Sequence, residues 1–248
     1  SGGWLFDDYP NIVNNPGVQP ANISLPALAK AALSSPASEF RRPLASLSFA
    51  ANYLAGGLDP FGWKLVNLVI HLLNGVLVYV LARRLIGLAE PRAGPPGLPA
   101  ALVAAAWLLA PINLTGVLYV VQRMESLANL CVLLGLAGYV VARQGMLGTV
   151  PGGRSEWGRL ALAATALLAG TACGLLAKET AVLLPLYAWL VEWIVFGFAR
   201  STTTPTHRNI DWRLHGLFTL VLWLPLLAGL AWLLPDVANP GRWATRDF

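Results

Sequence analysis

Long apolar segments alternate with short polar ones over most of this chain. Apolar runs of about 20 residues, the length that an α-helix needs to cross a bilayer, recur after the first quarter of the sequence. Charged residues, proline or glycine bound most of these runs. The pattern predicts an all-α polytopic membrane protein. The expected spans are 65–85, 99–118, 124–142, 159–177, 180–198 and 215–234.

Two parts of this pattern are interrupted. Pro111 follows only a short apolar segment, and Asn113 and Thr115 come next. Backbone that leaves the helix at membrane depth is tolerated only where protein or a cavity surrounds it. Such breaks often mark binding sites. The sequence 159–198 is too long for one crossing, so we expect a hairpin at Lys178-Glu179-Thr180.

Polar residues recur at helical spacing in the first expected span. Positions i, i+3, i+7 and i+10 are Lys64, Asn67, His71 and Asn74. Polar groups are costly in hydrocarbon, so this stripe should face the bundle interior or a wet cavity. Hydrogen bonds between helices, each contributing about 0.6 kcal/mol, are the expected role of Asn74. For His71 that role and a functional one stay open.

The third expected span also begins with polar residues. Gln122, Ser126 and Asn129 share one helical face, and Arg123 and Glu125 lie beside them. We therefore expect a group of polar side chains turned in one direction just after the interrupted span.

The first 64 residues contain no run long enough to cross a bilayer. Residues 24–35 and 43–54 repeat apolar residues at helical spacing, with Ser24 as the expected N-cap. We expect two short amphipathic helices that lie in the membrane interface. The predicted division is an outer loop over 1–64, a transmembrane bundle over 65–234 and the start of a further outer loop over 235–248.

Composition agrees with a membrane protein. The chain is 56% hydrophobic and 12% charged, with a mean hydropathy of +0.60. A soluble domain of this length does not need so much apolar side chain. The sequence pI is about 9.6, but the basic residues form no runs, which argues against nucleic-acid binding.

Charge also indicates an orientation. The connections 86–98, 143–158 and 199–214, with the residues next to them, hold nine basic and three acidic residues. Short arginine-rich connections stay on the inner side of a membrane, so we place residues 1–64 on the outer side. A chain made inside must deliver this loop outside, and we therefore expect a further span before Ser1. Both ends look like cuts through a longer protein.

The strongest candidates for a site all fall on the outer side in this topology. A carboxylate can take the proton of an acceptor hydroxyl, and fixed cations stabilise a phosphate leaving group. Acids and cations on one side therefore indicate a site for a phosphorylated substrate, although a solvated loop would also carry such charges. The candidates are Asp7, Asp8, Arg41, Arg42, Gln122, Arg123, Glu125, Lys178 and Glu179.

Five segments, in order, resemble one known family. They are Phe6-Asp7-Asp8-Tyr9-Pro10, which continues to Pro16, Arg42-Pro43-Leu44, the stretch 67–74, the stretch 119–126, and Leu176-Ala177-Lys178-Glu179-Thr180. They resemble the membrane part of the transmembrane-and-tetratricopeptide-repeat O-mannosyltransferases and their bacterial relatives, within the GT-C superfamily. No single motif is specific, but the combination is.

The resemblance implies a membrane glycosyltransferase with a GT-C-like fold. Such enzymes take a sugar from a polyprenyl-phosphate carrier and place it on an acceptor hydroxyl, here protein Ser or Thr, at the outer face. A bacterial inner membrane with the site facing the periplasm is the implied location. The implied partners are membrane lipid, the lipid-linked donor, a protein acceptor and other membrane subunits.

The resemblance also implies roles for the candidate residues. The acidic motif of the family matches Asp7 and Asp8, which become the expected catalytic carboxylates. No metal ligands are assigned, although a divalent cation stays open. The expected contacts to the donor phosphate are Arg41, Arg42, Arg123 and Lys178, supported by His71, Gln122, Glu125 and Glu179.

Departures from the family leave other interpretations open. Relatives usually have His-Pro and Thr-Glu where this chain has Ala110-Pro111 and Leu114-Thr115, and they commonly have His at Lys64. These losses favour a catalytically silent subunit that keeps the fold within a larger complex. A transporter or lipid flippase would also have a broken span, but no inverted repeat is visible.

Overall fold

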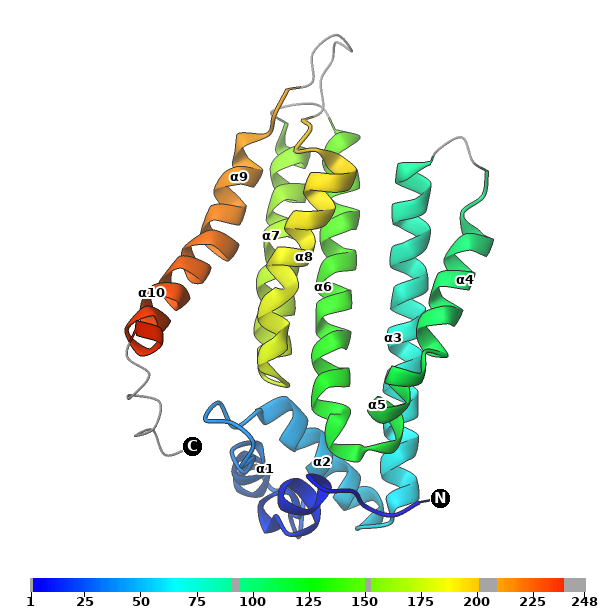
Figure 1. The fold of residues 1–248 in the computed structure, drawn as a ribbon, viewed down its shortest axis with the longest axis vertical. Helices are drawn as coiled ribbons and strands as arrows, with labels where there is room; N and C mark the ends of the chain where they lie inside the picture. Colours follow the sequence, from blue (N-terminus) through cyan, green and yellow to red (C-terminus); the bar gives the residue numbers. More distant parts are fainter. Residues whose placement is uncertain (1, 91–93, 150–152, 201–208, 239–248) are drawn as a thin grey trace.

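The protein is a bundle of helices with a small helical lobe packed at one end (Figure 1). The computed structural model describes residues 2–90, 94–149, 153–200 and 209–238. Within those ranges all regular structure is helical, apart from a single bridge between Ala199 and Ile210. The predicted all-α membrane architecture is confirmed.

Five helical segments of the described chain are long and apolar enough to cross a membrane. A bent pair forms a sixth span if its two parts are counted together. The six predicted spans are thus confirmed, with ends that differ by a few residues. The single segments are Pro60–Ala89, Val120–Leu147, Arg154–Leu175, Glu179–Phe196 and Trp212–Pro235, and the bent pair joins Gly97–Leu108 to Pro111–Leu118.

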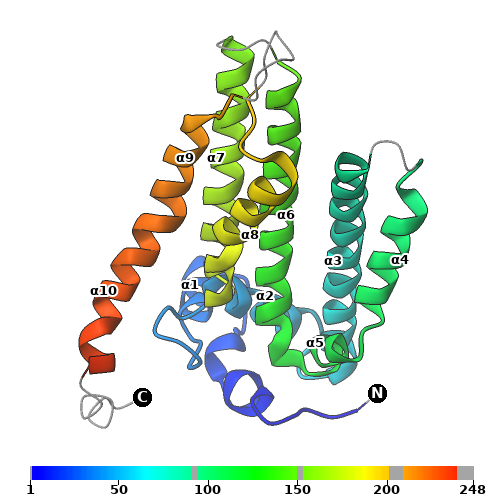
Figure 2. The same ribbon diagram turned by 45° about the horizontal axis from the view of Figure 1, so that its top comes forward.

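Helix α6 (Arg123–Leu147) lies at the centre of the bundle. It packs against α3 (Pro60–Ala89) on one side and against α7 (Arg154–Leu175) and α8 (Leu184–Val191) on the other. Helix α4 (Gly97–Leu108) lies beside α3. Figure 2 shows this α3–α4 pair separated by α6 from the remaining helices. Helices α9 (Trp212–Phe218) and α10 (Leu224–Ala238) complete the bundle.

Two glycines allow a close contact between α6 and α7. A Cβ atom added to Gly170 of α7 would lie 2.9 Å from the Cα atom of Gly135 in α6, which is too close for any real side chain. Small residues at such contacts let helices approach in a membrane, where packing rather than hydrophobicity drives association. Helices α6 and α7 are therefore closely packed.

The predicted break in the second span is present. Helix α4 ends at Leu108, and Pro111 begins a 3₁₀ turn that leads into α5 (Leu114–Leu118), with a bend of 53°. Proline lacks an N–H and pushes the preceding residue out of the helical region, and Ala110 is extended accordingly. The Asn113 amide donates to the carbonyl of Trp107 at 2.6 Å and fixes the bend.

The predicted hairpin is also present. Helix α7 ends at Leu175, Lys178 is extended, and a 3₁₀ turn over Glu179–Leu183 leads into α8. Lys178 and Glu179 do not pair with one another. Each is instead held by a partner from another part of the chain.

The N-terminal lobe holds the two predicted short helices, α1 (Leu25–Ala32) and α2 (Pro43–Gly56). Ser24 stands at the N-cap of α1, but its side chain makes no capping bond. The lobe has its own apolar core, in which Phe49 and Trp63 pack against Val120. Ile23 and Leu25 are 78% and 82% exposed. That exposure suits an interfacial position, which stays a prediction.

We call the end of the bundle that carries this lobe the loop end, and the other the opposite end. The loop end also holds α5 and the hairpin after α7 (Figure 1). A further loop was predicted over 235–248. Helix α10 continues to Ala238, and residues 239–248 lie outside the described residues. The centres of the three breaker-rich connections, 91–93, 150–152 and 201–208, lie outside them as well.

Candidate functional site

The segment Tyr119–Glu125 organises the loop end, and we call it the junction segment. It links α5 to α6 through a 3₁₀ turn over Val120–Gln122. Four residues of this segment contact four different parts of the chain. The contacts are Val121 with Asp8, Arg123 with Asn67, Met124 with Arg42 and Glu125 with Lys178.

Asp8 fastens the N-terminal loop to the junction segment. The carboxylate is fully buried and accepts hydrogen bonds from the N–H groups of Val121 at 2.7 Å and Leu5 at 3.0 Å. Burial raises the pKa of Asp8, although these N–H groups and the charge of Lys64 act in the opposite direction. These contacts give Asp8 a structural role in holding the loop. The catalytic role expected for Asp8 stays a prediction.

Asp7 has the opposite environment. Its side chain is exposed, and its backbone N–H donates to the Tyr119 hydroxyl oxygen at 2.8 Å. The Asp7 carboxylate also interacts with this hydroxyl. Tyr119 is the first residue of the junction segment, so Asp7 is an accessible carboxylate held beside it.

Arg123 lies at the centre of the lobe contact and not in a binding site. Its side chain is fully buried, and its guanidinium donates to the side-chain oxygens of Asn67 at 2.7 Å and Asn52 at 2.8 Å. It also donates to two backbone carbonyls and lies over the rings of Phe49 and Trp63. The Arg123 donors thus join α2, α3 and α6, and the phosphate-binding role expected for Arg123 stays a prediction.

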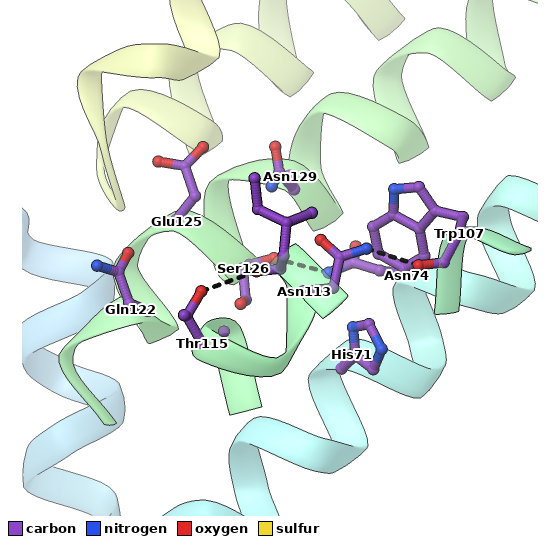
Figure 3. Close-up of a pocket in the computed structure, with 11 residues that line it drawn as sticks. His71, Asn74, Trp107, Asn113, Thr115, Gln122, Glu125, Ser126 and Asn129 are labelled. Atoms are coloured by element: carbon purple, nitrogen blue, oxygen red, sulfur yellow. Dashed lines mark hydrogen bonds between the residues drawn. The ribbon is translucent and has the colours of Figure 1, made fainter. Parts of the chain in front are cut away.

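A polar cavity of about 220 Å³ opens between α3, α5 and α6 (Figure 3). The predicted faces of the first and third spans meet here, since His71 and Asn74 of α3 lie opposite Gln122, Ser126 and Asn129. The broken span closes the remaining side. The lining residues are His71, Asn74, Trp107, Ile112, Asn113, Thr115, Gly116, Gln122, Glu125, Ser126 and Asn129.

Some of these polar groups are used to join helices. The Asn74 amide donates to the Ser126 carbonyl at 2.9 Å. A ring nitrogen of His71 lies 3.1 Å from the carbonyl oxygen of Leu108, and the His71 ring stacks on Trp107. The predicted role of Asn74 in helix contact is confirmed, and His71 has such a contact while it also lines the cavity.

Lys178 connects the cavity to the hairpin. Its ammonium group pairs with the Glu125 carboxylate at 3.0 Å, and Thr180 donates to the same carboxylate at 3.2 Å. The two charged side chains are 28% and 31% exposed. This pair is therefore reachable from solvent, and water screens it.

Arg42 anchors the lobe to the hairpin. Its guanidinium forms a two-bond fork with Glu179, with distances of 3.2 Å and 2.8 Å. The fork occupies the Arg42 donors that were expected to bind phosphate. Arg41 is exposed, with one weak contact to the Ser35 carbonyl at 3.5 Å. Arg41 and Arg42 both have positive φ angles in the turn before α2.

The structure thus brings the nine sequence candidates to the loop end, but some of them are buried and others are exposed. Neither Asp7 nor Asp8 forms an ion pair with an arginine or lysine within the described chain. Among the described residues no group of three or more His, Cys, Asp or Glu side chains could hold a metal ion. Among the candidates, Asp7 and Arg41 are exposed, and Gln122, Glu125 and Lys178 are half-buried.

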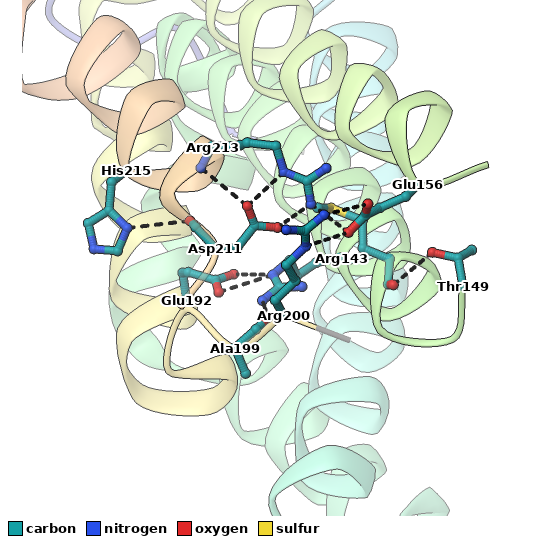
Figure 4. Close-up of polar contacts among 10 residues, drawn as sticks. Arg143, Thr149, Glu156, Glu192, Ala199, Arg200, Asp211, Arg213 and His215 are labelled. Carbon is teal, nitrogen blue, oxygen red and sulfur yellow. Dashed lines mark hydrogen bonds and ion pairs between the residues drawn. The ribbon is translucent and has the colours of Figure 1, made fainter. Parts of the chain in front are cut away.

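The opposite end carries a second charged cluster that sequence reasoning missed (Figure 4). Glu192 is fully buried and accepts hydrogen bonds from Arg143 at 2.9 Å and from the Tyr139 hydroxyl at 2.7 Å. Buried Glu156 pairs with Arg200 and Arg213. Arg213 also pairs with Asp211, which lowers the pKa of Asp211 although burial raises it. A carboxylate inside an apolar span was the available signal, since such a group requires a partner.

Curated proteins similar to this chain share one name. Protein O-mannosyl-transferase Tmtc1 of Drosophila melanogaster is 34% identical over 141 residues, and Tmtc2 of the same organism is 39% identical over 143 residues. Each match covers 57% of this chain and 14% of the fly protein. Human protein O-mannosyl-transferase TMTC4 is 32% identical over 160 residues, which is 20% of its length.

The chain therefore spans only a small part of the length of these relatives. No family model matches the chain, and no solved structure does. The similarity rests on several relatives with the same name, and it extends over more than half of this chain. Over that part, this chain is similar to the transmembrane-and-tetratricopeptide-repeat (TMTC) O-mannosyltransferases.

Proposed function

We propose that this chain is the membrane part of a glycosyltransferase that moves a sugar from a polyprenyl-phosphate carrier to a Ser or Thr hydroxyl of a protein. One observation carries the proposal: the accessible Asp7 contacts the start of the junction segment, whose later residues line a polar cavity. The names of the relatives agree with a sugar transfer to protein.

Asp7 is the proposed general base. A hydroxyl is a weak nucleophile until a positioned base takes its proton, and a carboxylate within hydrogen-bond reach can do so. Asp7 is exposed, whereas Asp8 is enclosed. The adjacent carboxylates therefore divide the work, with Asp8 holding the loop that presents Asp7.

Lys178 and Arg41 are the proposed contacts to the donor phosphate. The leaving phosphate gains charge in the transition state, and fixed cations stabilise it. Lys178 is partly exposed, and its partner Glu125 lies on the cavity wall, so a phosphate could replace Glu125 at the ammonium group. Arg41 is exposed at the start of α2.

The loop end is the proposed outer face. The opposite end holds the arginine-rich connections, among them Arg143, Arg200 and Arg213, which favour the inner side. With this orientation the site faces the periplasm of a bacterial inner membrane, where the lipid-linked donor and a protein acceptor would meet.

A second candidate is a catalytically silent membrane subunit within a larger complex. One observation favours it: two cations expected to bind phosphate, Arg42 and Lys178, are already paired with Glu179 and Glu125. In that case the ion pairs serve only to close the lobe onto the hairpin.

Sugar transfer by the purified protein in vesicles distinguishes the two candidates. We expect transfer from a polyprenyl-phosphate sugar to a Ser- or Thr-containing acceptor, and a loss of about 10²–10⁴-fold for Asp7→Asn. Asp59→Asn is the matched control, because Asp59 caps α3 through the Phe61 N–H and asparagine caps equally well. Equal rates for Asp7→Asn and Asp59→Asn would remove Asp7 from the chemistry. Absence of transfer by the unmodified protein would favour the silent subunit.

A further inference from the structure

The cavity between α3, α5 and α6 holds a buried polar atom without a partner. The Asn74 side chain is 2% exposed, and its Nδ2 atom donates to the Ser126 carbonyl. Its Oδ1 atom has no hydrogen-bond partner within the described chain. A buried acceptor left unpaired costs free energy, so such an atom calls for a ligand or a water molecule.

Two further amides line the same cavity without partners. The side chains of Gln122 and Asn129 are half-buried, and neither forms a hydrogen bond with another described residue. Gln122 ends the 3₁₀ turn before α6 and Asn129 lies in α6, and in Figure 3 Asn74 projects from α3. Each free amide offers both donors and an acceptor. The cavity therefore presents neutral hydrogen-bonding groups from two helices.

The remaining walls narrow the chemistry of an occupant. Trp107 supplies an aromatic surface that His71 stacking holds in place. Glu125 is the one charged residue among those that line the cavity. At about 220 Å³ the cavity is smaller than the pockets of about 300–1,000 Å³ that take drug-sized ligands. A single ring with many hydroxyl groups and no negative charge fits these features.

We propose that this cavity binds the uncharged sugar ring of the donor, and that Asn74, Gln122 and Asn129 read its hydroxyl groups. The inference rests on the proposed function and adds to it the cavity that holds the sugar ring and the residues that contact it. Lys178 pairs with Glu125 at the cavity wall, so a phosphate on Lys178 would place an attached sugar ring next to these amides. A uronic acid would bring a second carboxylate beside Glu125, and the cavity disfavours it.

Binding of three lipids tests this subsite without requiring turnover. The probes are a polyprenyl phosphate without sugar, the same lipid carrying mannose, and the same lipid carrying glucuronic acid, each titrated onto the purified protein in detergent. We expect mannose to increase affinity over the bare lipid and glucuronic acid to give no increase. Equal affinity for the bare and mannose-bearing lipids, or binding of neither, would overturn the subsite.

Two variants locate the effect within the cavity. Asn129→Leu and Gln122→Leu should each reduce the affinity for the mannose-bearing lipid by about threefold to tenfold, as loss of a hydrogen bond does, and leave the bare lipid unchanged. Gln144→Leu is the control, since Gln144 lies on the same helix at the opposite end, where it bonds Arg84. An equal loss for both lipids, or no loss in either cavity variant, would contradict the proposal.

These outcomes separate the subsite from the proposed function. If the protein transfers sugar but binds the mannose-bearing lipid no more tightly than the bare lipid, the proposed function stands and the subsite is wrong. If the protein binds the mannose-bearing lipid more tightly but transfers no sugar, the subsite stands as a binding site of a silent subunit and the proposed function is wrong.

Discussion

The two ends of the bundle use charged residues in different ways. At the opposite end Arg143, Glu192 and Glu156 are almost wholly buried. The ion pairs there join α6 to the turn after α8, and α7 to Arg200 and to α9. At the loop end the Lys178–Glu125 pair is partly exposed, Asp7 is accessible, and the side-chain amides of Gln122 and Asn129 have no described partner.

This difference separates residues that hold the fold from residues that can act on a ligand. A buried charge is tolerated only when it is paired, and breaking the pair is costly because the other charge remains buried. Exposed pairs contribute little to stability and can exchange partners. By this criterion the opposite end is structural, and the loop end, apart from Asp8 and Arg123, is available for function.

The largest stability effect is expected at the opposite end. Arg143→Met should lower the free energy of unfolding by about 3–5 kcal/mol, because it leaves Glu192 buried without its cation. The double variant Arg143→Met/Glu192→Leu should recover most of the loss. Thermal unfolding in detergent measures both. Loss of an exposed ion pair lowers the free energy of unfolding by only about 0–1 kcal/mol. A loss no larger than this for Arg143→Met would contradict the contrast between the two ends.

A smaller stability effect is expected at Asp8. Asp8→Asn keeps the shape but places an amide where two backbone N–H groups need an acceptor. Local stability of the N-terminal loop should fall by about 1–3 kcal/mol. Limited proteolysis of residues 2–20 measures this opening. The protease should cleave Asp7→Asn, which changes an exposed neighbour, at the wild-type rate. If the protease cleaves both variants at the same rate, Asp8 does not anchor the loop.

The smallest effects concern pH, and they have opposite signs at the two ends. The pKa of Asp8 is raised from 3.8, so its contribution to stability is largest below 3.8 and falls as the pH rises through the folded-state pKa. The pKa of Asp211 is lowered from 3.8, so its contribution is present above 3.8 and is lost as the pH falls through the folded-state pKa.

Unfolding midpoints between about pH 3 and about pH 7 test these signs. Relative to Asp8→Asn, the unmodified protein should gain stability as the pH falls. Relative to Asp211→Asn, it should lose stability at the acidic limit. Asn also serves as an N-cap, so Asp211→Asn preserves the start of α9. Identical pH profiles for both variants would contradict the assignment.

The sequence alone predicted the helices and the end at which the candidates gather. Apolar run length identifies spans, and Pro111 and the Lys178-Glu179-Thr180 interruption identify the break and the hairpin. Helical spacing also predicted that His71, Asn74, Gln122, Ser126 and Asn129 turn inward, and all five line the cavity.

Burial could not be predicted, and it decides the roles. Asp7 and Asp8 are adjacent and chemically identical, yet the turn over the first residues exposes one and encloses the other. Arg123 follows Gln122, but it points into the lobe contact while Gln122 lines the cavity. Glu192 stands 49 residues from Arg143, and only the fold joins them.

The most direct test pairs one acidic residue from each end. Sugar transfer from the polyprenyl-phosphate donor and the unfolding midpoint are measured for Asp7→Asn and for Glu192→Gln. The account predicts a crossed result: Asp7→Asn loses about 10²–10⁴-fold in turnover with the midpoint unchanged, whereas Glu192→Gln lowers the midpoint and its folded fraction transfers at the wild-type rate. Wild-type turnover by Asp7→Asn would contradict it.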